Sequence, residues 1–232
     1  CASVAPDGLR GAVLQHAQDR LPAGAALPAP DHSARQQAQA NIAAWLQQPV
    51  DADTAVRIAL LNNPGLQARL AQLAGQDAAR AQALTLLNPT LSLARLTSPH
   101  EREIERQLSV GVVQLITLPW RTRWQGWQME RATLDAAQQV LALAADTRRA
   151  WLRAVAARQV LAARERMHAA AQVGAELAER MARVGNFSRL QQAQQLSVQH
   201  DSAAQLARAR LAAALESEQL ARLMGLWGDR KS

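Results

Sequence analysis

Apolar residues recur at helical spacing along most of this 232-residue chain, and they alternate with polar residues only over one short stretch. The beginning of the chain is different, because residues 1–50 hold five of the nine prolines, with Gly and Ala between them. This composition predicts an N-terminal tether with at most short helices, one of them from Ser33 to Gln47.

Two helices are expected after this tether. Asp53 is a suitable cap for a helix that runs to Leu61, because apolar residues follow it at helical spacing. A second helix is expected to start at Pro64, since Pro fits the first helical position and Asn63 before it is a favoured cap. Residues 51–88 therefore form the first helical segment.

The pattern becomes alternating at Pro89, which cannot continue a helix. Two alternating runs flank a charged segment, so residues 89–118 predict a β-hairpin. The second strand, Gln107 to Thr117, has about the 9 to 11 residues that a tilted strand needs to cross a bilayer. Its alternation breaks at Gln114, so the pattern does not tell which face of the strand would meet lipid.

A helical pattern returns at Pro119 and continues to about Val184 without a further proline. Gly185 and Asn186 tolerate the left-handed conformation that ends many helices. Such a helix is far longer than a small domain is wide.

A return helix is expected from Ser188 to about Leu226, because Ser188 and Gln191 match the S-x-x-Q capping box. The chain therefore predicts a long helical hairpin over 119–228 and a short tail over 229–232. Apolar and small residues of the return helix have coiled-coil spacing, and this seam comprises Leu206, Ala209, Ala213, Glu216, Leu220, Leu223 and Trp227.

The composition favours a mainly α fold. Hydrophobic residues make up 49% of the chain but aromatic residues only 3%, and most of the apolar share is Ala and Leu. The net charge is +7, and Arg supplies almost all of the positive charge. These Arg are scattered along helical segments, whereas a nucleic-acid surface needs a patch or stripe. We therefore expect no nucleic-acid partner.

Residue patterns that would indicate catalysis or a bound metal are missing from the sequence. The five His do not fall within metal-ligand spacing of one another, and the four Met occur singly. The sequence has no G-x-S-x-G elbow and no Gly-rich phosphate loop. We expect no catalytic residue, no metal site, no cofactor and no enzymatic activity.

The single cysteine stands at position 1. It predicts either a processed bacterial lipoprotein, lipidated at Cys1, or an arbitrary boundary of the sequence. In the first case Ala2 favours sorting to the outer membrane, because Asp is the residue at this position that favours retention in the inner membrane. No apolar run approaches the roughly 18 residues of a spanning helix.

Three tryptophans follow the expected hairpin at spacing i, i+4 and i+7: Trp120, Trp124 and Trp127. Arg121 and Arg123 lie between them. Indole rings and Arg side chains suit a membrane interface, where rings anchor and guanidinium groups reach phosphate. Packing of these rings against neighbouring helices is the alternative.

Five segments in this order resemble the TolC family of outer-membrane efflux proteins. Their sequences are most similar to those of lipoprotein members that serve heavy-metal efflux, and the similarity covers residues 50 to 228. The segments are TAVRIALLNNPGLQA (54–68), LLNPTLSL (86–93), SVGVVQLITLPWRTR (109–123), RMARVGNFSRLQQAQ (180–194) and LARLMGLWG (220–228).

The resemblance implies a protomer of two such repeats, with three protomers forming a β-barrel continuous with a periplasmic helical tunnel. It implies a passive conduit for solute export, lipid-anchored in the outer membrane, with a periplasmic adaptor and an inner-membrane pump as partners. The adaptor is expected to contact the hairpin tip at Gly185, Asn186, Phe187 and Ser188. This chain corresponds to the first repeat only, so it is expected to be a fragment or truncated product, or else to assemble from six copies.

Two other classes of protein fit the same pattern. One is a coiled-coil scaffold without a channel, in which the hairpin over 89–118 lies on the surface of the protein. The other is an Arg-rich helical protein that binds nucleic acid, which would bind DNA with a steep salt dependence.

Overall fold

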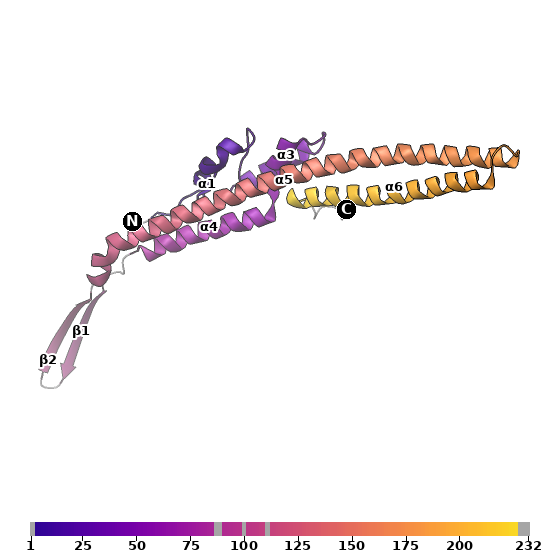
Figure 1. Ribbon diagram of the computed structural model, residues 1–232. Helices are drawn as coiled ribbons and strands as arrows, with labels where there is room; N and C mark the ends of the chain where they lie inside the picture. The colour runs from indigo at the N-terminus through magenta and orange to yellow at the C-terminus, as the bar shows by residue number, and fades with distance from the viewer. Residues whose placement is uncertain (1–2, 86–89, 99–100, 110–111, 227–232) are drawn as a thin grey trace. The chain divides into compact units, whose positions relative to one another are not determined.

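The computed structural model describes residues 3–85, 90–98, 101–109 and 112–226. This part of the chain is mainly helical, with six α-helices, a short 3-10 helix (η1, Gln18–Arg20) and one two-stranded sheet (Figure 1). It divides into two compact units, one of residues 1–19 and 65–139 and one of residues 20–64 and 140–232. The longest helix, α5 (Val112–Arg183), contributes residues to both units.

The second unit contains α2 (His32–Trp45), α3 (Ala52–Asn62), the later part of α5 and α6 (Arg189–Leu223). A core of Ile42, Ala55, Ile58 and Met224 joins α2, α3 and the end of α6. Trp45, Val50, Leu61, Trp151, Leu220 and Leu226 pack around this core. The core of this unit thus joins residues far apart in the sequence.

Helix α3 starts two residues before the expected position. The Asp51 carboxylate accepts a hydrogen bond from the Thr54 backbone N–H, at 2.7 Å, and is the N-cap of the helix. The prediction that Asp53 caps this helix is wrong. Asp51 and Asp53 are both favoured caps, and the sequence pattern alone does not separate them.

The later part of α5 and α6 form an antiparallel helical hairpin (Figure 1). Gly185 adopts φ +80°, and the Asn186 N–H donates to the Met181 carbonyl at 2.9 Å, which closes the end of α5 as a left-handed turn. The capping box is confirmed: Ser188 and Gln191 exchange backbone and side-chain hydrogen bonds at 3.2 and 2.8 Å.

Small residues line the contact between α5 and α6. The predicted seam residues Leu206, Ala209 and Ala213 are buried, and Glu216 pairs with Arg153 of α5 at 3.0 Å. In the part of α5 that runs beside α6, the buried alanines include Ala150, Ala154, Ala175 and Ala178. Such residues allow two helices to approach closely, but each contributes little apolar area.

The first unit contains α1 (Arg10–Ala17), α4 (Pro64–Ala83) and the early part of α5. The two strands, β1 (Thr90–Ser98) and β2 (Glu101–Ser109), also belong to it. They pair antiparallel, with Thr90 opposite Ser109 at one end and Ser98 opposite Glu101 at the other.

The second strand is therefore not where the sequence pattern placed it. We expected Gln107 to Thr117, but β2 ends at Ser109 and α5 has begun by Val112, with Pro119 inside the helix. The expected helix start at Pro119 is also wrong. An apolar run as short as this one fits a strand or a helix equally well, because periodicity does not distinguish them over a few residues.

Candidate functional site

The tip of the α5–α6 hairpin is exposed. Gly185, Asn186 and Ser188 are exposed and Phe187 is partly buried, so the structure brings all four predicted adaptor-contact residues together at one turn. Apolar side chains flank this turn, with Val184 at 70% and Leu190 at 69% of their full exposure. A Cβ added at Gly185 would meet no atom within 4 Å. The turn is therefore held by its backbone and its cap, with little packing around it.

The opposite end of the hairpin is closed by two asparagines. Asn62 donates hydrogen bonds from its side-chain amide to the carbonyls of Met224 and Gly225, at 3.1 and 2.9 Å. Asn63 donates to the Leu223 carbonyl at 3.0 Å. These carbonyls belong to the end of α6, where a helix has no backbone donors left for them. The Asn-Asn-Pro sequence thus fixes the end of α6 beside the junction of α3 and α4.

Gly225 allows this junction to form. It adopts φ +72°, and an added Cβ would lie 2.9 Å from the Asn62 carbonyl carbon and closer still to its oxygen. Trp151 of α5 strengthens the same end by donating its indole N–H to the Val50 carbonyl at 2.8 Å. An Arg148–Asp53 ion pair lies nearby at 3.1 Å.

Polar pairs interrupt the seam between its buried Ala residues. Arg164 donates to the Gln205 side chain, and His168 Nδ1 lies 2.9 Å from Ser202 Oγ. Ser202 already donates its proton to the Gln199 carbonyl, at 2.7 Å. Its oxygen therefore accepts from His168, so that the Nδ1 nitrogen is the protonated one.

Large apolar side chains also cover the outer faces of this hairpin. They are not part of the seam, and most are more than half exposed. They are Leu152, Val160, Met167, Val173, Leu177, Val184, Leu190, Leu196, Val198, Leu211 and Leu215.

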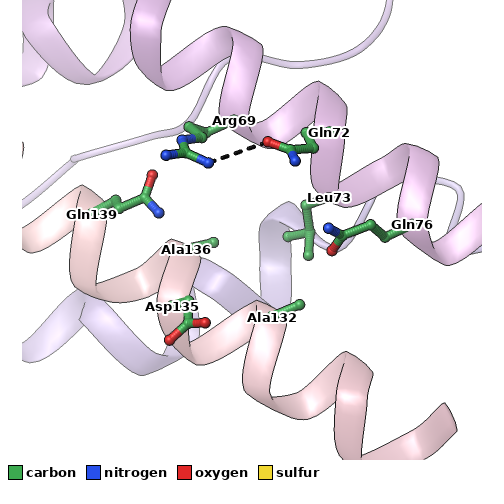
Figure 2. A pocket seen from close by; sticks show the side chains of 8 residues that line it. All are labelled: Arg69, Gln72, Leu73, Gln76, Ala132, Asp135, Ala136 and Gln139. Atoms are coloured by element: carbon green, nitrogen blue, oxygen red, sulfur yellow. Dashed lines mark hydrogen bonds between the residues drawn. The ribbon is translucent and has the colours of Figure 1, made fainter.

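In the first unit, α4 and α5 enclose a small polar groove (Figure 2). Its volume is about 140 Å³, and the Arg69 guanidinium donates to the Gln72 side chain above it, at 3.3 Å. The remaining lining residues are Leu73, Gln76, Ala132, Asp135, Ala136 and Gln139. The lining thus combines one guanidinium, one carboxylate and three amides with small and apolar residues.

A buried carboxylate ties the N-terminal segment to α4. Asp77 is fully buried and accepts from the Ala5 backbone N–H and from Arg80, both at 2.8 Å. Arg80 also donates to the Ser3 carbonyl at 3.4 Å. No sequence pattern predicts this contact, because Asp77 and Arg80 have the spacing of an ordinary surface pair and their partners are more than 70 residues away.

The three tryptophans of α5 do not pack into a core. Trp120, Trp124 and Trp127 are 79%, 59% and 66% exposed, so in this unit the rings do not pack against neighbouring helices. They line one groove together with Arg121 and Arg123. Arg121 donates to the Ala83 carbonyl of α4 at 2.6 Å.

The predicted lipidation residue, Cys1, lies outside the described residues. Among those residues, no three His, Cys, Asp or Glu side chains come together as a metal site. No helix within the same part of the chain has the length and apolar character needed to cross a membrane.

No protein-family model matches this chain, and no curated protein matches it. Its fold is similar to that of a solved structure, a membrane protein from Pseudomonas aeruginosa, with a TM-score of 0.62 and 17% identity. The match covers 79% of this chain and 48% of the other, so the chain spans about half the length of that protein. At this identity the likeness shows the fold alone: long helices that pack together, as in a membrane protein of known structure.

Proposed function

We propose that this chain forms part of the wall of an outer-membrane efflux duct of the TolC family. In this role it conducts solute passively and catalyses no reaction. The observation that carries the proposal is the α5–α6 hairpin, whose small-residue seam is buried while large apolar side chains cover its outer faces.

The apolar side chains on these outer faces would be stabilised by packing against other helices. Leu152 and Leu211 are 60% and 61% exposed, although a two-helix coiled coil in water would normally carry polar residues at such positions. Burying apolar surface stabilises an assembly by about 25 cal/mol per Å². Packing against other copies of the chain, side by side in a tube, would remove these side chains from water.

The two strands point to the same kind of assembly. A two-stranded sheet leaves both outer edges unpaired, which is unfavourable in water and more so in lipid. In the proposed duct the edges pair with further strands, from other copies or from further residues of the protein, in a trimeric barrel. The barrel would lie in the outer membrane, with Cys1 lipidated beside it and the helices extending into the periplasm.

The remaining partners follow from the same proposal. The exposed turn at Gly185–Ser188 would contact a periplasmic adaptor, and an inner-membrane pump would drive export and select the substrate, a heavy metal or a drug. No metal site is needed in the wall of such a duct.

The proposal can be tested with a photo-crosslinking amino acid placed at Leu211 in cells that express the full chain. We expect crosslinked oligomers of the chain in the outer-membrane fraction. The matched control is Arg210, which is exposed on the same helix but should face water and give little crosslinking. A soluble monomer, or equal crosslinking at both positions, would contradict the duct.

One observation favours a second candidate, a periplasmic coiled-coil scaffold without a channel. The sequence of β2 carries Glu or Arg at positions 101, 102, 103, 105 and 106. A lipid-facing Arg near the bilayer centre costs about 2–4 kcal/mol. The scaffold predicts that the chain stays in the soluble periplasmic fraction, whereas the duct predicts outer-membrane material that resists carbonate extraction.

A further inference from the structure

The strongest feature that the proposed function leaves unused is the exposed aromatic surface of α5, formed by Trp120, Trp124 and Trp127. At about 100° per residue, these three positions fall within a sector of roughly 60° on one side of the helix. They line a groove with a volume of about 490 Å³, and the other lining residues are Arg121, Arg123 and Gln125. Tryptophan is usually well buried in a folded protein, so three exposed rings in two turns indicate a ligand surface.

The charged residues that line this surface have one sign, and the nearest carboxylate in the sequence is Glu130, three residues after Trp127. Between residues 110 and 129 the chain contains two Arg and no Asp or Glu. In the described part of the chain, no ion pair involves Arg121 or Arg123. On the helix these two residues lie on opposite sides of the indole sector. An occupant that matches this surface is apolar in its middle and carries negative charge at its edge.

The shape of the surface distinguishes a lipid from a protein partner. All six lining residues lie between Trp120 and Trp127, within two turns of one helix. A stable protein–protein interface needs about 20–30 residues from each partner, whereas six residues line this surface. A single lipid is much smaller than a protein partner, and indole rings favour the boundary between acyl chains and headgroups.

We propose that this surface binds an anionic phospholipid, with Arg121 and Arg123 on the phosphate and the three indoles against the upper part of the acyl chains. The Arg121 bond to the Ala83 carbonyl holds its guanidinium at the edge of the surface. The other N–H groups of this guanidinium can still donate to a phosphate. The proposal rests on the proposed function in one respect, since that function places this end of α5 at a membrane.

The test uses the full chain and two kinds of vesicle, of phosphatidylcholine alone and with phosphatidylglycerol added. We expect clear preference for the vesicles with phosphatidylglycerol, and quenching of tryptophan fluorescence when that lipid carries brominated chains. The double variant Arg121→Gln/Arg123→Gln should lose about 30-fold in affinity for these vesicles, as two charges near an anionic surface predict. The triple variant Trp120→Ala/Trp124→Ala/Trp127→Ala should lose the quenching.

The matched control is Arg158→Gln, which removes one charge from an exposed position of α5 far from the surface. If it weakens binding as much as the double variant, binding depends on net charge alone and the lipid site is refuted. Equal binding of the unmodified chain to both kinds of vesicle would also refute the lipid site. Displacement of the chain from vesicles by polyglutamate would refute it as well, because it would indicate an acidic protein partner. Preference for phosphatidylglycerol in a chain that never oligomerises in the outer membrane would contradict the duct while supporting this site.

Discussion

The two ends of the α5–α6 hairpin are built differently. At the inner end, Ile58 and Met224 lie in a hydrophobic core, and the side chains of Asn62 and Asn63 cap the last carbonyls of α6. At the tip, the seam consists of Ala residues and polar pairs, and the turn at Gly185 has no atom within 4 Å of the space where a Cβ would be. One end is held by burial and specific hydrogen bonds, the other by local backbone structure.

This difference indicates where the hairpin can change its packing at least cost. Separation of the helices at the inner end would expose a core and leave partly buried carbonyls without donors. Near the tip, the His168–Ser202 pair can exchange its hydrogen bond for water, and the small seam residues expose little apolar area. For the proposed duct, gating motions should therefore take place at the tip while the inner end stays closed.

The largest expected effect comes from emptying the core at the inner end. Ile58 is fully buried, and Ile58→Ala should lower the free energy of unfolding by about 3–4 kcal/mol through lost burial and a cavity. Leu196 near the tip is 40% exposed, and Leu196→Ala should cost less than about 1 kcal/mol. Urea unfolding followed by circular dichroism at 222 nm measures both. Equal losses would show that the two ends are packed alike.

The two glycines at the ends of the hairpin give the next largest contrast. Gly225 and Gly185 both have positive φ, so an alanine is strained at either position. Only at Gly225 would the new Cβ also meet the Asn62 backbone. Gly225→Ala should therefore cost about 2–3 kcal/mol and Gly185→Ala about 1 kcal/mol. If Gly185→Ala destabilises the chain more in thermal unfolding, the tip is the better-packed end.

The same contrast explains what the sequence could predict. The capping box at Ser188 and the stop at Gly185 depend on neighbours in the chain, and the sequence placed both correctly. The hydrogen bonds from Asn62 join residues more than 160 positions apart, so no local sequence pattern predicts them. The second strand was placed wrongly because a short apolar run of Val and Leu satisfies both helical and strand periodicity.

The exposed tryptophans show a second limit of prediction from the sequence. Their spacing predicted one common helix face, but a face of three indoles suits a membrane interface or a helix contact equally well. The structure adds that the three rings are exposed in this unit, which their spacing does not predict. Exposure depends on which segments fold beside a helix, and the sequence pattern of α5 alone does not contain that information.

A smaller effect is expected from the asparagine cap. Asn62→Ala removes two hydrogen bonds to carbonyls at the end of α6 and should cost about 1–2 kcal/mol. The matched control at the tip is Asn186→Ala, since Asn186 is exposed and should change stability by less than about 0.5 kcal/mol. Amide hydrogen exchange should show the loss of protection at Met224 and its neighbours only in Asn62→Ala. Equal fraying at the inner end in both variants would mean that the cap does not hold α6.

The smallest expected effect is a difference in pH dependence between the helix caps at the two ends. The hydrogen bonds from the Thr54 backbone and side chain hold the pKa of Asp51 below its usual value of 3.8. A carboxylate whose pKa is lower in the folded state stabilises the fold above its unfolded pKa, and this contribution is lost as the pH falls through the folded pKa. Ser188, the cap at the tip, does not titrate.

Acidification below about pH 4 should therefore loosen the start of α3 but leave the start of α6 unchanged. Amide NMR signals report this directly, because the Thr54 N–H donates to Asp51 and the Gln191 N–H donates to Ser188. Asp51→Asn keeps a capping side chain but cannot ionise, so the Thr54 signal should lose most of its pH dependence in this variant. A Thr54 signal that still titrates in Asp51→Asn would assign the effect to another carboxylate of the second unit.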